Sequence, residues 1–277
     1  MLVILALAVG GLIFGSFIDA LIWRIHEQSL LQKKKQAMVP RDLTMLHGRS
    51  MCPNCRHTLS PWDLIPVVSW VLLRGKCRYC GKSISWQVPV VELLTGTLFV
   101  LSYIFWPTTM HGLGLLQFCF WLAFLVGFVA LIVYDLKWYI LPDRIVYPLI
   151  VLAVIEAIIT LTLFHGGWLA ALGSVWGVLI ASGIFYVLYQ VSDGAWIGGG
   201  DVKLGVVLGI LLGGPLLSFM LLFLASVLGT LVSIPLLVAG RAKRSTLIPF
   251  GPFLIAATII LELFATHFVD WLAHFSG

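Results

Sequence analysis

The sequence predicts an all-α polytopic membrane protein, with about eight transmembrane helices and one polar loop domain on the cytoplasmic side. Of its 277 residues, 60% are hydrophobic and only 10% are charged, whereas soluble domains carry about 25% charged residues. The apolar residues form continuous runs instead of alternating with polar ones, which disfavours an outer-membrane β-barrel. Composition therefore excludes a soluble enzyme built around one large core.

Eight apolar segments are expected to form the transmembrane helices. They cover residues 1–22, 89–106, 114–134, 145–163, 168–190, 202–213, 216–238 and 250–268. The first segment lacks the basic region and the cleavage motif of a signal peptide, so we expect a retained span. The sixth segment, 202–213, rises only about 18 Å as a helix, against about 30 Å of hydrocarbon. A re-entrant loop there would place the basic segment 241–244 outside, so we favour a crossing.

The positions of the basic residues predict the orientation of these helices. With the N-terminus outside and eight crossings, all 17 Lys and Arg residues fall on the cytoplasmic side. The outer loops and the C-terminal tail carry none. Because Lys and Arg concentrate in the cytoplasmic loops of membrane proteins, the net charge of +5 reflects topology. It does not indicate a nucleic-acid partner.

The polar residues suggest three parts of the chain. Residues 1–22 are expected to form the first transmembrane helix, 23–88 a cytoplasmic loop domain, and 89–277 the transmembrane core. The loop holds 11 of the 17 basic residues and four of the five cysteines. It is too small to bury a large core, so we expect a metal ion or another cross-link to stabilise it.

The four loop cysteines form two C-x2-C pairs with 21 residues between them. This spacing is typical of structural Zn²⁺ bound by four thiolates. Two disulfides are the alternative, but a cytoplasmic loop lies in a reducing compartment. A redox dithiol would be expected within a βαβ pattern, which is not visible here. His47 and His57 are rival ligands, and Cys119 is expected to pack in an apolar span. The expected zinc ligands are Cys52, Cys55, Cys77 and Cys80.

Two aspartates stand at the predicted cytoplasmic ends of apolar segments. Asp135 closes the third segment, and Asp201 opens the sixth directly after three glycines, 198–200. An acid inside a bilayer costs about 2.5–3.5 kcal/mol, so each is a functional candidate. The predicted topology brings both to the same membrane face at similar depth. We expect the glycines to leave room for an extended peptide beside Asp201.

Such a pair of carboxylates has a definite chemistry. Two carboxylates held close together do not both ionise, so one keeps a proton. One then activates a water while the other polarises a carbonyl, which suits peptide hydrolysis. The ordinary alternatives are helix caps and ion pairs, Asp201 with Lys203 or Asp143 with Arg144. Asp143 is also a rival to Asp135 for membership of the pair.

Several stretches together resemble the type IV prepilin peptidase family, also called leader peptidase/N-methyltransferase. "GSFIDALIWR" is similar to the first-span signature of that family, and the cysteine loop is similar to its cytoplasmic loop. "YDLKWYILPD" and "GGGDVKLGVVLG" match its two aspartate motifs, and "IPFGPFL" its last span. The resemblance implies an aspartic intramembrane peptidase of the GxGD type, with Asp135 and Asp201 as the catalytic pair.

The resemblance also implies substrates, cofactors and location. Family members of the bacterial inner membrane cleave the basic leader of type IV prepilins or type II secretion pseudopilins after a glycine. Many then methylate the new N-terminal residue with S-adenosylmethionine. The implied partners are a prepilin leader with its helix, and membrane lipid; Zn²⁺ is structural and no residue is assigned to S-adenosylmethionine. Two other functions compete: an ion-coupled transporter, and a membrane scaffold with a zinc module.

Overall fold

The computed structural model describes residues 1–33, 44, 48–163, 167–240 and 248–276, with side chains as far as Phe264. Within these ranges the chain forms helices and no β-strand. Six helices are long and apolar enough to cross a membrane, and a shorter apolar helix covers Gly251–Phe264. The predicted class, an all-α polytopic membrane protein, is therefore confirmed. The basic segment 241–244, used to predict the topology, lies outside the described residues.

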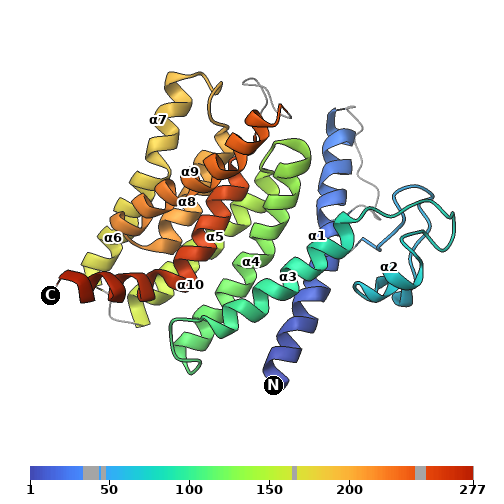
Figure 1. The fold of residues 1–277 in the computed structure, drawn as a ribbon, viewed down its shortest axis with the longest axis horizontal. Coiled ribbons are helices and arrows are strands. Elements are labelled where there is room, and N and C mark those ends of the chain that lie inside the picture. Colours follow the sequence, from blue (N-terminus) through green and yellow to red (C-terminus); the bar gives the residue numbers. More distant parts are fainter. Residues whose placement is uncertain (34–43, 45–47, 164–166, 241–247, 277) are drawn as a thin grey trace. The chain divides into compact units, whose positions relative to one another are not determined.

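The chain forms two compact units, Met1–Ile104 and Phe105–Gly277. The first unit contains α1 (Leu2–Lys33), the 3-10 turn η2 (Pro61–Leu64), and the helices α2 (Val68–Leu72) and α3 (Gln87–Ile104) (Figure 1). Helix α1 continues to Lys33, well past residue 22, where the first predicted span ends. The loop with the cysteines connects α1 to α3.

Small residues allow α1 and α3 to pack closely. A Cβ built on Gly11 would lie 2.6 Å from the Cα of Gly96, and one on Gly15 would lie 2.5 Å from the Cα of Glu92. No side chain fits in such a space, so the two backbones touch. Small residues four apart are a common device for helix packing in membranes, where lipid tails provide no hydrophobic driving force.

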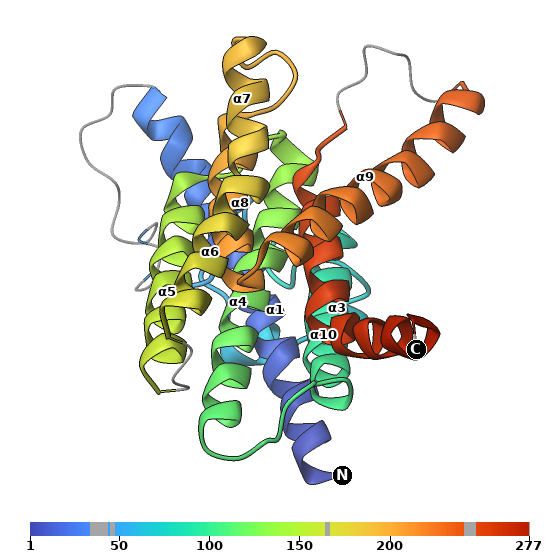
Figure 2. The same ribbon diagram turned by 90° about the vertical axis from the view of Figure 1, so that its left-hand side faces the viewer.

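The described part of the second unit forms seven helices, whose arrangement is drawn in Figures 1 and 2. They are α4 (Leu113–Trp138), α5 (Asp143–Leu163), α6 (Gly167–Ala181), α7 (Gly183–Val191), α8 (Gly199–Leu212), α9 (Pro215–Val238) and α10 (Gly251–Ser276). Helix α4 provides the largest share of the core, with Trp121, Phe124 and Phe128 almost fully buried. The predicted segment 168–190 divides into α6 and α7 at Ser182, whose hydroxyl donates to the carbonyl of Val202 at 2.8 Å.

Helix α8 contacts five other helices: α5, α6, α7, α9 and α10. Against α6 it presents a row of glycines. A Cβ on Gly209 would lie 2.7 Å from the carbonyl oxygen of Gly177, and one on Gly205 would lie 2.6 Å from that of Ala181. The obstacles are backbone atoms, which cannot move aside as a flexible side chain can. The glycines therefore set how closely α8 lies against α6.

We expect Gly209→Ala to lower the free energy of unfolding of the protein by about 1–3 kcal/mol, because the added methyl group overpacks the α6–α8 contact. Thermal unfolding in detergent measures this effect. Gly183→Ala is the matched control, since a Cβ there meets nothing within 4 Å. Ala is the better helix former by about 1 kcal/mol, so the control variant should be as stable as the wild type or more so. Equal behaviour of the two variants would contradict the prediction.

Candidate functional site

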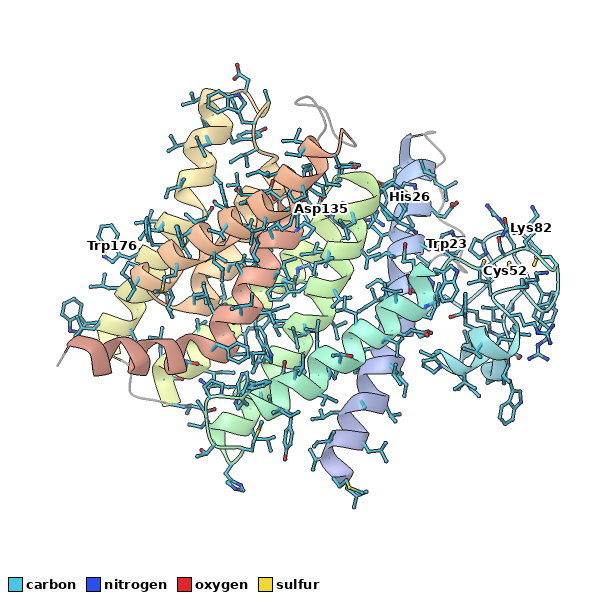
Figure 3. The ribbon with its side chains drawn as sticks, in the orientation of Figure 1. Trp23, His26, Cys52, Lys82, Asp135 and Trp176 are labelled. Carbon is cyan, nitrogen blue, oxygen red and sulfur yellow. The ribbon has the colours of Figure 1, made fainter. Side chains whose placement is uncertain are left out.

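Asp135 lies in the last turn of α4 and is buried, with 5% of its surface exposed. Its carboxylate accepts a hydrogen bond from the backbone N–H of Gly251, the first residue of α10. The helix ends shortly after Asp135 because Tyr139 adopts a left-handed conformation, with φ of 56°, and its N–H bonds to the Asp135 carbonyl at 2.8 Å. Figure 3 labels Asp135 at this end of α4. Two helix ends therefore position one carboxylate.

Asp201 lies in the first turn of α8 and is half-buried. Gly198 is the N-cap residue, and its backbone N–H donates to the Asp201 carboxylate. Its carbonyl accepts the N–H of Asp201 at 3.0 Å. The N-terminus of a helix carries a partial positive charge, which favours an acid in the first turn. The local structure thus accounts for an acid after the glycines.

The structure brings together the helix ends that carry Asp135 and Asp201. Leu141, in the turn after α4, lies between the helix ends: a Cβ on Gly200 would be 2.8 Å from the Cβ of Leu141, and one on Gly251 would be 3.4 Å from a Leu141 methyl carbon. The end of α4 and the starts of α8 and α10 therefore converge around one side chain.

The glycines before Asp201 do not all leave free space. At Gly200 the side of the backbone that a Cβ would occupy is filled by Leu141, and at Gly199 it faces the ring of Tyr189. At Gly200 the close approach is thus made by the chain's own turn, and room for a peptide beside Asp201 stays a prediction. Gly198 has only the Asp201 carboxylate and the N–H of Gly200 close by.

Asp143, the rival candidate, has a different environment from Asp135. It is the first residue of α5, its side chain is 53% exposed, and it accepts a hydrogen bond from the Lys203 ammonium at 2.6 Å. The observed ion pair, Asp143 with Lys203, is neither of the two pairs considered from the sequence, which were Asp201 with Lys203 and Asp143 with Arg144. It joins the start of α5 to the second turn of α8. Exposed pairs of this kind contribute about 0–1 kcal/mol.

The four loop cysteines form one cluster in the first unit. Their sulfur atoms all lie within 4.8 Å of one another, and Cys52 Sγ is 3.9 Å from Cys80 Sγ. Four thiolates at 2.3 Å from a tetrahedral ion would be about 3.8 Å apart. All five cysteines, each of them in the described part of the chain, are free thiols. The cluster could therefore hold a metal ion, and the two disulfides considered from the sequence are not formed in this structure.

The two cysteine pairs have the same backbone geometry. The N–H of Cys52 bonds to the carbonyl of His57 at 3.0 Å, and the N–H of Cys77 to that of Lys82 at 2.8 Å. Burial of Cys52 opposes ionisation, but backbone N–H groups of Cys55 and Asn54 donate to its sulfur and lower the pKa of the thiol to about 7. The first turn thus favours a thiolate at Cys52, the form that binds metal. At Cys80 a backbone hydrogen bond from Lys82 lowers the pKa of the thiol, but burial and the neighbouring thiols raise it to about 11. The rival His57 packs against the ring of Tyr79 instead, with ring centroids 3.7 Å apart and the rings tilted by 36°. His47 lies outside the described residues.

Asp63 connects the segment between the two pairs to the second cysteine turn, a role that the sequence analysis missed. Its side chain is only 2% exposed and accepts hydrogen bonds from Arg78 Nε at 2.7 Å, the Ser60 hydroxyl at 2.9 Å and the Tyr79 hydroxyl at 3.2 Å. Burial raises the pKa of this carboxyl, but the donors, Arg78 above all, lower it overall. The Ser60-x-x-Asp63 spacing of a capping box was the available signal.

Glu92 is a further buried acid, in α3 of the first unit. Its carboxylate accepts the backbone N–H of Val67 at 2.7 Å. Val67 is the N-cap residue of α2 and has a φ of 60°, a conformation that β-branched residues rarely adopt. Glu92 therefore anchors the start of α2, and this contact accounts for an acid inside an apolar helix.

Two family models match the chain. The Bacterial Peptidase A24 N-terminal domain matches residues 9–106, and the Type IV leader peptidase family matches residues 119–234. The first match covers the cysteine cluster, and the second covers both Asp135 and Asp201. No solved structure matches the chain significantly.

Curated relatives match over nearly the whole length. A prepilin leader peptidase/N-methyltransferase of Stutzerimonas stutzeri is 32% identical, over 92% of this chain and 88% of the relative. A prepilin leader peptidase/N-methyltransferase of Pseudomonas aeruginosa is 31% identical, over 96% of this chain and 92% of the relative. A type 4 prepilin-like proteins leader peptide-processing enzyme of Escherichia coli is 33% identical, over 92% of each chain. On these matches the chain belongs to the type IV leader peptidase family.

Proposed function

We propose that this protein cleaves the leader peptide of type IV prepilins or pseudopilins, with Asp135 and Asp201 as its catalytic pair. The observation that carries the proposal is the convergence around Leu141 of the helix ends that carry these two carboxylates, at one end of the second unit. Relatives of nearly the same length are named for prepilin processing. Membranes that contain the chain should therefore shorten a prepilin that control membranes leave intact, and an uncut prepilin would contradict the proposal.

The geometry supports hydrolysis by a water held between the two acids. One carboxylate removes a proton from the water, and the other, protonated, polarises the scissile carbonyl. Gly251 holds Asp135 in place, and Gly198 does the same for Asp201. These contacts restrain each carboxylate before the substrate arrives, so less reorganisation is needed in the transition state.

The orientation that we propose places the active site at the cytoplasmic face, with the N-terminus outside. Lys137 follows Asp135 at the end of α4, and Lys203 follows Asp201 near the start of α8. Arg144 lies at the start of α5, which directly follows the turn after α4, and basic residues concentrate on the cytoplasmic side of membrane proteins. A prepilin could then keep its basic leader in the cytosol while its apolar helix enters the bilayer. The membrane is proposed to be the bacterial inner membrane.

We propose Zn²⁺ as the ion of the cysteine cluster, held by Cys52, Cys55, Cys77 and Cys80, where it would cross-link the loop. The purified full chain should contain one zinc per molecule by elemental analysis. Cys77→Ser should lose most of that zinc, because three thiolates leave the tetrahedral site open, while Cys119→Ser should keep it. Retention of zinc by Cys77→Ser would contradict the assignment.

Methylation of the new N-terminal residue with S-adenosylmethionine is the second proposed activity. Its support is the printed name of the relatives, which couples peptidase and N-methyltransferase. We assign no residue to the methyl donor. Neither the transporter nor the scaffold alternative gains support from the family to which the chain belongs.

A further inference from the structure

Helix α2 of the first unit carries an exposed apolar face. Val68, Val71 and Leu72 are 50%, 59% and 77% exposed. Residues at positions i, i+3 and i+4 lie on one side of a helix, so these three form a single surface. The other side of α2 faces the loop: Trp70 packs on Trp86, with ring centroids 4.1 Å apart. Such a face needs an apolar environment outside the described chain.

The depth of α2 follows from its anchor on α3. The N–H of Val67, immediately before α2, bonds to Glu92 at 2.7 Å. Glu92 comes five residues after Gln87, where α3 begins, and five residues rise about 7.5 Å along a helix. Helix α3 is one of the helices long and apolar enough to cross a membrane. In Figure 1, α2 correspondingly lies below the start of α3, toward the N-terminal end of α1.

The residues around α2 match the chemistry of a membrane surface. Trp86 is 70% exposed and directly precedes α3, and Trp is enriched where a helix enters the bilayer. Arg74 and Lys76, just after α2, are exposed and available to the phosphates of anionic lipids. Helices that lie in the interface bury their apolar face about 5–10 Å deep and keep basic residues at the headgroups, which agrees with the depth of α2.

We propose that α2 lies in the bilayer leaflet that surrounds the start of α3, with Val68, Val71 and Leu72 among the acyl chains and with Arg74 and Lys76 at the phosphates of anionic lipids. The cysteine loop is then held against the membrane by lipid as well as by α1 and α3. The inference does not depend on the proposed peptidase activity, and it is tested without substrate cleavage.

The test uses the full chain in vesicles of phosphatidylethanolamine and phosphatidylglycerol. A small fluorescent noncanonical amino acid replaces Leu72 in one sample and Lys82, which is exposed on the second cysteine turn, in the matched control. Lipids with a nitroxide high on the acyl chain should quench the probe at Leu72 at least about two-fold more than the probe at Lys82. Iodide in the aqueous phase should quench the probe at Lys82 more strongly than the probe at Leu72.

A photo-cross-linking amino acid at Val71 provides a second measurement in the same vesicles, and it should attach to lipid. The proposal is overturned if the probes at Leu72 and Lys82 respond alike to both quenchers. It is also overturned if quenching or cross-linking at α2 appears only after a prepilin is added, since the face would then bind the substrate. Unchanged zinc content in each labelled sample shows that the loop is folded.

Discussion

Asp135→Asn and Asp201→Asn should each lower kcat for prepilin cleavage by about 10²- to 10⁴-fold, the range expected when a general acid or base is removed. Asn has the shape of Asp but neither accepts a proton from water nor donates one as a carboxylic acid. The amount of protein in the membrane should stay unchanged. The measurement is the rate of leader removal from a prepilin by purified protein in detergent.

The double variant should cleave prepilin only slightly more slowly than either single variant, because the effects of substituting residues that act as one catalytic unit are not additive. Asp143→Asn is the matched control. It removes the exposed ion pair with Lys203, which is worth at most about 1 kcal/mol, so cleavage should fall by less than about five-fold. Near-normal cleavage by either Asp135→Asn or Asp201→Asn would remove that residue from the catalytic pair.

Much of this site could be predicted because its signals are local or follow from topology. Each cysteine pair spans only a short turn, so the spacing alone indicates a shared ion. Asp135 and Asp201 stand at the ends of helices that the count of crossings places on the same side of the membrane. Their convergence needs no knowledge of side-chain packing, only of the direction in which each helix runs.

What the sequence analysis missed depends on packing between distant segments. Nothing near Asp135 in the sequence indicates that the N–H of Gly251 reaches its carboxylate. Likewise, the glycines before Asp201 indicate that something approaches closely but not what it is. The structure identifies Leu141 at Gly200. A glycine indicates missing volume, and only the fold identifies the group that fills it.

Gly251→Ala should lower prepilin cleavage by about 100-fold while leaving the folded protein nearly as stable as the wild type. A Cβ at this position would lie 2.7 Å from Oδ2 of Asp135, closer than two such atoms can approach, and 3.4 Å from a methyl carbon of Leu141. The carboxylate must therefore move. A displacement of about 1 Å in a catalytic group can cost 10²-fold in rate. Cleavage rate and thermal unfolding of the same preparation measure the two effects.

Gly183→Ala is again the matched control, because Gly183 and Gly251 are each the first residue of a helix and a Cβ at Gly183 meets nothing within 4 Å. It should cleave prepilin at the wild-type rate. The contrast is informative because the obstacle at Gly251 is the end of a flexible side chain, which moves at little cost in stability. That side chain belongs to Asp135, one of the two proposed catalytic aspartates. The movement of Asp135 that preserves the fold is therefore the one that removes activity. Full cleavage by Gly251→Ala would show that the position of Asp135 against α10 does not matter for the reaction.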